Sequence, residues 1–289
     1  MSIQQRLPVG DTSVPSSNQR ERDVVFTARG SSAATEAVWR AGALIGYESM
    51  NYRPPDRFEV DFVDWPFSKL KEQAVPDVEG AWERHLKTVK SERPKYAVAP
   101  DDDENSLGWE WVIECADRLD EYATTVIVVP KMHHPTDVPS RFRVGLPCQE
   151  RYGPSPHPWT AYRNVREVHL LGGSPLKQIQ ARKYGVPVES ADTTSPLTAA
   201  KWMDYFDGSG WSSLPEERSD YYECINRSYR NLRKALNPDR KIWSPYWRNR
   251  VEDWKQEFRE THPDADCWGP NDSIPHPGHY GWDDVANTY

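Results

Sequence analysis

Short runs of β-branched and aromatic residues recur along the first two thirds of the chain. Each run is followed by polar residues or by Pro or Gly, which is typical of buried strands bounded by turns. Eight runs fit this description and predict eight strands: VVFTA (24–28), ALIGY (43–47), EVDFV (59–63), KYAVA (95–99), TVIVV (125–129), FRVGL (142–146), EVHLL (167–171) and PVESA (187–191).

Helical patterns separate several of these runs. In residues 77–92 the apolar side chains recur with the spacing of one helix face. Residues 106–122 begin with Ser106 as a cap candidate, and residues 174–185 begin with Ser-Pro and end at Gly185. Strands that alternate with helices favour a parallel sheet, and eight of them favour a closed (β/α)8 TIM barrel of the α/β class. The first strands are only about 15 residues apart, which is short for a helical crossover, so an open doubly wound sheet is the alternative.

The pattern divides the chain into three parts. Residues 1–22 are polar and rich in Pro and Ser, which indicates a flexible arm, and residues 23–236 hold the predicted barrel. Within the barrel, residues 197–211 predict a closing helix and loop, and residues 216–238 predict a long helix. Residues 237–289 form a C-terminal extension that is first basic and aromatic and then irregular.

Composition narrows the class of protein. The hydrophobic fraction is 37% and the mean hydropathy is −0.84, but 13 Trp, 14 Tyr and 7 Phe supply a large buried surface. No apolar run approaches the ~20 residues of a membrane span, and the first residues have no signal-peptide core. The four cysteines have no CxxC spacing and are interpreted as reduced thiols. We expect a cytoplasmic protein with no membrane partner.

Side chains that could take part in catalysis or binding follow the predicted strands. In a barrel, the residues just past the carboxyl ends of the strands face the active site. Any one Asp or Gly there is an ordinary turn or capping residue, but their recurrence favours a shared site. Two carboxylates that face one pocket suit chemistry at a sugar anomeric carbon, where one attacks and the other manages a proton. The residues concerned are Asp64, Asp101, Asp102, Asp103, Lys131, His133, His134, Gln149, Arg151, Gly172, Gly173 and Asp192.

The stretch VHLLGGSP…GVPVESADTTSP (168–196) resembles the end of the tRNA-guanine transglycosylase barrel, above all its archaeal branch. In that family a V-H-L-F-G-x-G-H-P strand is followed, about one helix later, by a strand that ends in the nucleophilic aspartate. The resemblance implies that Asp192 is the nucleophile and that the backbone of Gly172 and Gly173 lines the pocket.

Three further segments carry weaker parts of the same resemblance. FVDWPF lies where the family has D-S-G-G-F, which implies that Asp64 is the second catalytic aspartate. KYAVAPDDD lies where the family has a base-recognising aspartate, which implies this role for Asp101. VGLPCQERYG is similar to the family's glutamine-bearing strand, which implies that Gln149 holds the base, although the VIVVPKMHH strand is an alternative match.

The departures from the family select a branch of it. The chain has no C-x-C-x-x-C zinc cluster, and the barrel leaves no room for the archaeal tRNA-binding domain. It is most similar to the compact phage and bacterial relatives that insert 7-deazaguanines into DNA. The resemblance implies exchange of guanine in DNA for a 7-deazaguanine such as preQ0 through a covalent Asp-glycosyl intermediate, without metal or cofactor. The alternatives are a tRNA substrate, an N-glycoside hydrolase and a non-catalytic nucleic-acid-binding barrel. A homodimer and a helper protein are both left open.

One strongly basic stretch stands out in a chain of net charge −8. Residues 226–250 carry eight Lys or Arg against one Asp, with Tyr and Trp between them. Cations neutralise phosphates and aromatic rings stack on unpaired bases, which favours nucleic-acid binding over a merely solvated helix face. The predicted contacts are Arg227, Arg230, Arg233, Lys234, Arg240, Lys241, Arg248 and Arg250. The spacing of His and Cys in the tail matches no zinc motif, so no metal is predicted.

Overall fold

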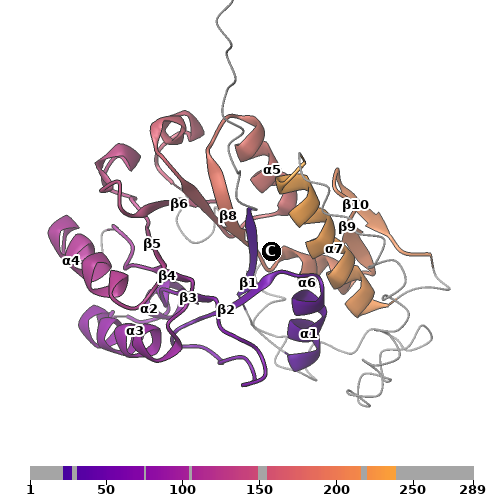
Figure 1. Cartoon of the computed structure of the whole chain (residues 1–289), viewed down its shortest axis with the longest axis horizontal. Helices are drawn as coiled ribbons and strands as arrows, with labels where there is room; N and C mark the ends of the chain where they lie inside the picture. Colours follow the sequence, from indigo (N-terminus) through magenta and orange to yellow (C-terminus); the bar gives the residue numbers. More distant parts are fainter. Residues whose placement is uncertain are drawn as a thin grey trace, which may run out of the picture.

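The protein is an eight-stranded parallel barrel. The structure is a computed structural model that describes residues 22–27, 31–74, 76–103, 106–148, 155–215 and 220–238. Each strand pairs with the next along the chain, and the last pairs with the first, so the sheet closes (Figure 1). The predicted (β/α)8 fold is confirmed, and the open sheet is excluded. The strands are β1 (Asp23–Thr27), β2 (Leu44–Glu48), β3 (Phe62–Asp64), β4 (Tyr96–Val98), β5 (Thr125–Val128), β6 (Arg143–Pro147), β7 (Val168–Leu171) and β8 (Val188–Asp192).

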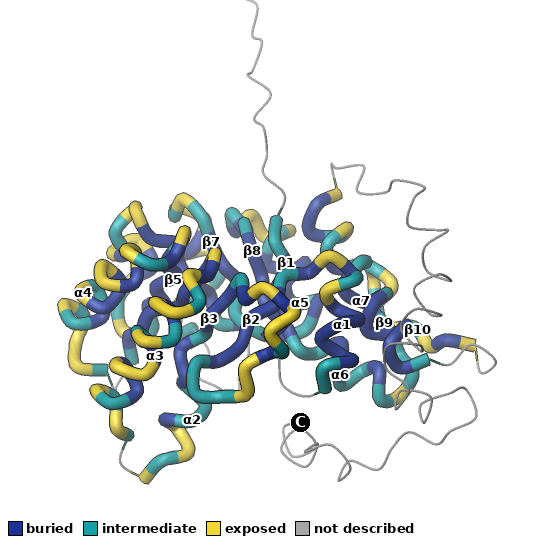
Figure 2. The backbone as a smooth tube through the Cα atoms, turned by 60° about the horizontal axis from the view of Figure 1, so that its bottom comes forward, coloured by how far each residue is buried: buried dark blue, intermediate teal, exposed yellow. Residues whose placement is uncertain are grey.

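Helices of unequal length connect the strands and cover the outside of the barrel. In Figure 2 the strands form a dark, buried centre, whereas α3 and α4 turn exposed faces outward. The helices are α1 (Ser32–Arg40), α2 (Phe67–Lys71), α3 (Val78–Glu92), α4 (Trp109–Asp120), α5 (Pro175–Lys183), α6 (Ser195–Ala200) and α7 (Tyr221–Leu236), with 3-10 turns η1 (Pro135–Asp137) and η2 (Trp159–Asn164). In the part of the chain that the structure describes, no helix has the length and apolarity to cross a membrane.

The helix starts follow from side chains that accept backbone N–H groups. Ser174 caps α5 by accepting from Lys177 N, as the Ser-Pro pattern predicts, and Asp77 caps α3 by accepting from Gly80 N. The prediction that Ser106 caps the next helix is wrong, because α4 begins after Gly108. The Ser106 hydroxyl instead accepts from Gly108 N at 3.4 Å, within the turn that precedes the helix.

Two connections differ from the regular pattern. The short spacing between the first strands is met by the nine-residue helix α1 after β1 and by a connection without a helix, residues 49–61, after β2. After α6 the chain forms an antiparallel hairpin, β9 (Asp204–Phe206) and β10 (Trp211–Ser213), where a helix and loop were predicted. The Asp207 carboxylate accepts from the N–H groups of Ser209 and Gly210, and this side-chain turn folds the hairpin.

A stacked pair of rings, Phe62 and His169, lies inside the barrel. A Cβ at Gly46 of β2 would lie 2.5 Å from the Phe62 carbonyl oxygen and 2.6 Å from the Phe62 Cβ, so only glycine lets β3 approach this closely. Phe62 then reaches the interior and stacks on His169 of β7, with ring centroids 5.3 Å apart. Both rings are fully buried. The His169 ring therefore lies inside the barrel, as the apolar sequence around it indicates.

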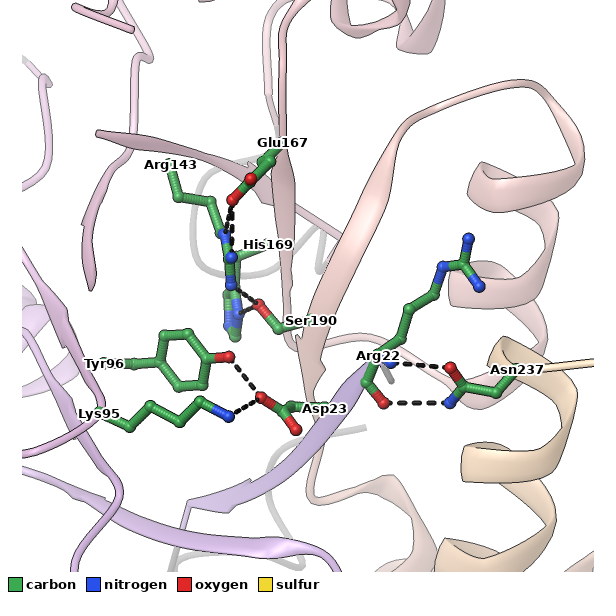
Figure 3. Close-up of polar contacts among 9 residues, drawn as sticks. All are labelled: Arg22, Asp23, Lys95, Tyr96, Arg143, Glu167, His169, Ser190 and Asn237. Atoms are coloured by element: carbon green, nitrogen blue, oxygen red, sulfur yellow. Dashed lines mark hydrogen bonds and ion pairs between the residues drawn. The ribbon is translucent and has the colours of Figure 1, made fainter. Parts of the chain in front are cut away.

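The β1–β8 pair is the seam that closes the barrel, and the residue before β1 is bound to the end of α7. Val25 of β1 lies in register with Asp192 of β8. Just before β1, the Arg22 N–H and carbonyl bond the side-chain amide of Asn237, the residue that ends α7 (Figure 3). Helix α7 lies beside α1 and covers this seam (Figure 1).

A buried histidine between two tryptophans gives the fold a specific pH dependence. His85 of α3 packs edge-on against Trp65, contacts Trp82 and lies with Nδ1 3.0 Å from the Ser49 hydroxyl. Burial lowers the pKa of His85 from 6.5 to about 3.

We predict that the protein loses stability through His85 as the pH falls from about 6.5 toward about 3. In that window the unfolded chain takes up a proton that the folded protein excludes, at up to about 1.4 kcal/mol per pH unit. Urea unfolding at a series of pH values should show a shallower acid dependence for His85→Gln than for wild type. Equal slopes for the two proteins would contradict this assignment.

Candidate active site

The site is built around the carboxylate that ends β8. The Asp192 Oδ1 accepts the N–H of Gly172 at 3.0 Å and lies 3.3 Å from His169 Nε2. The other oxygen, Oδ2, accepts only from the Thr27 hydroxyl, at 3.4 Å, among the hydrogen bonds of the described residues. The Asp192 side chain is 10% exposed. One oxygen is thus contacted by two nitrogens, and the second oxygen is less constrained at the carboxyl end of the barrel.

The double glycine after β7 shares this site. Gly172 and Gly173 have φ angles of 63° and 78°, in the left-handed region that favours glycine. The Gly172 turn points its N–H at Asp192, and the Gln178 side-chain amide donates to both the Gly172 and the Asp192 carbonyls, at 2.9 and 2.6 Å. The hydroxyls of Thr193 and Ser195 both donate to the Gly173 carbonyl. The ends of β7 and β8 are therefore fixed against each other, as the pattern of a shared site requires.

A buried polar chain continues from Asp192 into the barrel. His169 Nδ1 lies 2.7 Å from the Ser190 hydroxyl, which accepts from Arg143 at 2.9 Å, and Arg143 pairs with Glu167 at 2.7 Å (Figure 3). The Ser190 side chain is fully buried, so it does not meet a substrate, although Ser, His and Asp lie in one chain. The member of the chain that reaches the mouth of the barrel is Asp192.

The second predicted catalytic aspartate lies at the mouth as well. Asp64 is the last residue of β3 and is half-buried. It is two positions after Phe62, so both side chains project from the same face of the strand, and Phe62 stacks on His169 inside the barrel. Its register partner on β2 is Glu48, a 2% exposed carboxylate that accepts from Ser68 and Asn51.

Glu48 and Thr27 were missed by the sequence interpretation. Both are the final residues of their strands. Glu48 directly follows the predicted run 43–47 and has the same sequence signal as the other strand-end residues, whereas Thr27 lies inside the predicted run 24–28 and carries no such signal.

The acidic run after β4 is already engaged. Asp101 forms an ion pair of 2.6 Å with Lys131, which follows β5 and lies 3.8 Å from the centre of the Phe67 ring. Burial raises the pKa of Asp101, and the nearby Lys131 ammonium opposes this rise. Asp102 is 2% exposed and accepts from the Met132 and His133 backbone, so it fixes the loop after β5. Asp101 is thus one half of a donor–acceptor pair.

Cys148 lines the site, and two of the predicted site residues lie outside the described part of the chain. Cys148 is buried against Gly173, and burial raises the pKa of its thiol to about 12, so the thiol stays protonated and is a wall of the site. Gln149 and Arg151 lie outside the described residues. Across the described ranges, no three His, Cys, Asp or Glu side chains are grouped so that they could hold a metal ion.

Four of the eight cations predicted to bind nucleic acid lie on α7, and the other four lie outside the described residues. On α7, Arg227 pairs with Glu223 and lies 5.3 Å from the Tyr205 ring centre, and Arg233 donates to the Ala41 carbonyl at the end of α1. These two cations therefore have roles within the fold. Arg230 and Lys234 lie on the same helix. Arg240, Lys241, Arg248 and Arg250 are outside the described residues, as are the tail His and Cys residues.

Comparison with known proteins assigns the chain to a family but not to an activity. Residues 38–237, which include all barrel strands but the first, match the model of a family of unknown function, DUF6610, and the chain belongs to that family. No curated protein matches the chain at a significant level. The chemistry is therefore argued from the site itself.

The close contact between Gly173 and Cys148 leaves no room for a side chain at position 173. A Cβ at Gly173 would lie 2.9 Å from the Cys148 carbonyl oxygen, in a backbone with φ of +78°. We predict that Gly173→Ala lowers the free energy of unfolding by about 1–3 kcal/mol or more, measured by urea denaturation. Gly208→Ala is the matched control, because Gly208 also has positive φ but open space around its Cβ. An equal loss in both variants would contradict the close packing of Gly173.

Proposed function

We propose that the protein is a guanine transglycosylase that exchanges guanine in a polynucleotide, with DNA preferred, for a 7-deazaguanine such as preQ0. The observation that carries the proposal is the state of Asp192 at the carboxyl end of the barrel. Its Oδ1 is contacted by Gly172 N–H and His169, whereas the one hydrogen bond of Oδ2 within the described residues is a long contact with the Thr27 hydroxyl. A carboxylate in this arrangement is suited to nucleophilic attack. The resemblance of residues 168–196 to the transglycosylase barrel supports the same assignment.

The proposed reaction has two symmetrical halves. Asp192 Oδ2 attacks C1′, the C1′–N9 bond breaks, and guanine leaves with the electron pair and takes a proton from Asp64. The incoming base gives its N9 proton to Asp64 and attacks C1′, and the bond to Asp192 breaks. Asp64 manages the proton in both halves, so proton and charge balance over one cycle. A guanine within a duplex must first leave the base stack, at a cost of a few kcal/mol.

Base recognition is assigned to the charged pair after β4 and β5. Guanine presents an oxygen acceptor at O6 beside N–H donors on its Watson–Crick edge. Asp101 supplies acceptors and Lys131 supplies donors, 2.6 Å apart in one pair. Such a pair matches both kinds of group on guanine. Gln149 is retained as a predicted base contact, and the Gly172 and Gly173 backbone as the pocket wall.

A covalent intermediate is the first test. Wild-type protein incubated with guanine-containing single-stranded DNA, without an acceptor base, should form a denaturant-resistant adduct visible by mass spectrometry. Asp192→Asn keeps an oxygen for Gly172 N–H but removes the nucleophile, so adduct formation should fall by about a thousandfold or more. Thermal unfolding serves as the control that the variant is folded.

Several outcomes would overturn the proposal. An adduct that survives in Asp192→Asn would place the nucleophile elsewhere. Failure of folded wild-type protein to exchange labelled guanine into either DNA or tRNA would exclude base exchange. Release of free guanine without incorporation would indicate an N-glycoside hydrolase, and binding of DNA unaffected by Asp192→Asn, without any turnover, would indicate a non-catalytic binding barrel. Exchange into tRNA alone would change the polymer and keep the reaction.

Removal of the recognition cation is the second test. Lys131→Met should raise the KM for the free base by about 10- to 100-fold, because a charged hydrogen bond contributes about 1.5–3 kcal/mol. The KM is measured by guanine exchange at saturating DNA. Lys69→Met is the matched control, since Lys69 pairs with Glu72 on the exposed face of α2. An unchanged KM in Lys131→Met would remove this pair from base recognition.

A further inference from the structure

The hydrogen bonds beneath Asp192 determine where the proton of His169 resides. Arg143 has only donors, so its contact of 2.9 Å uses a lone pair of the Ser190 hydroxyl. The single hydroxyl proton of Ser190 then points at its other neighbour, His169 Nδ1, at 2.7 Å. Nδ1 accepts, and the ring proton lies on Nε2, 3.3 Å from Asp192 Oδ1. The opposite tautomer would set a nitrogen lone pair against a carboxylate oxygen and leave the hydroxyl proton without an acceptor.

The groups around the His169 ring favour its neutral form and hold it in place. His169 faces Asp192 on β8, Arg143 on β6, Asp23 on β1 and Tyr96 on β4. Its ring is fully buried and stacked on Phe62. Burial lowers the pKa of His169, and the Arg143 cation acts in the same direction, while Asp192 and Asp23 oppose them. A neutral ring donates one hydrogen bond to Asp192 and does not neutralise its charge.

We propose that His169 is a positioning residue that holds Asp192 Oδ1 through Nε2–H, together with Gly172 N–H, and so presents Oδ2 as the reacting oxygen. The Arg143–Ser190 contact sets the tautomer that makes this possible. This inference rests on the proposed function, because it assigns a role within the reaction of Asp192. It predicts that the carboxylate is oriented by a donor chain that begins at the opposite end of the barrel.

A hydrogen bond outside this donor chain supplies the control for stability. The Tyr47 hydroxyl on β2 donates to the Glu92 carboxylate at the end of α3, at 3.1 Å. Tyr47 is buried, and the hydrogen bond is partly buried. Tyr47→Phe removes this hydrogen bond and keeps the ring, so it is the matched control for stability.

The tautomer can be measured directly on the full chain by ¹⁵N NMR of histidine rings. The His169 signals are identified by their loss in His169→Gln. We expect a protonated Nε2, an unprotonated Nδ1 and a His169 pKa below that of an ordinary histidine, because the ring is buried. Asp192→Asn should shift the Nε2 signal, and Ser190→Ala should allow the second tautomer. A protonated Nδ1, or an Nε2 signal that ignores Asp192→Asn, would overturn the proposal.

Kinetics separate positioning from packing. His169→Phe keeps an aromatic ring against Phe62 but loses the donor, and its kcat for guanine exchange should fall about 100-fold, as expected for a misplaced catalytic group, with the KM little changed. His169→Gln retains a side-chain N–H₂ and should recover most of this loss. Tyr47→Phe should lower thermal stability without lowering kcat. A fall in kcat that follows stability alone across the three variants would overturn the positioning role.

The two experiments also distinguish this inference from the proposed function. If guanine exchange is absent while the NMR signals behave as expected, the transglycosylase assignment fails and the His169–Asp192 coupling stands. If exchange occurs through Asp192 while His169→Phe retains full kcat, the positioning role fails and the function stands.

Discussion

The pairing of β1 with β8 is the constraint on which the rest of the molecule depends. It closes the sheet, sets Val25 beside Asp192, and brings the Thr27 hydroxyl to Asp192 Oδ2. The seam is secured by the reciprocal hydrogen bonds between Asn237 and the Arg22 backbone. Closure also removes sheet edges, whose unpaired backbone groups invite association with other chains.

Polar groups inside a barrel must satisfy one another, and here that requirement organises the site. Arg143, Ser190 and His169 form a continuous donor chain that ends on Asp192. Buried networks of this kind are favourable only when each member has a partner, and they then hold a single arrangement. The same physical demand that stabilises the barrel core thus orients a carboxylate at its mouth. Because the same residues serve stability and the proposed chemistry, the effect of a substitution on unfolding must be measured together with its effect on catalytic rate.

The strands were predictable because their signal is local. Seven of the eight runs became strands within one residue of both predicted ends, and the run 59–63 became the shorter strand β3, which starts three residues later. The agreement arises because β-branched residues bounded by turns leave few alternatives. The hairpin of β9 and β10 was not predicted, because its turn depends on how the Asp207 carboxylate bonds the backbone. The prediction of Ser106 as a helix cap was also local, and it failed because α4 begins after Gly108.

In the site, Asp192 and Gly172 were predicted from the strand ends, and a hydrogen bond connects them. The pairing of Asp101 with Lys131 was not predicted, because the two residues meet only when β4 and β5 lie side by side.

By itself the sequence determined the alternation of strands and helices, the eightfold count, and which residues end the strands, because these follow from hydrophobic period and turn chemistry along the chain. Only the tertiary structure decided which strand ends meet and which charges are already paired. It also decided the tautomer of His169, because Ser190, Arg143 and Asp192 reach that ring from two other strands. Such contacts depend on barrel closure and on the register of each strand pair, and neither is written in any single segment.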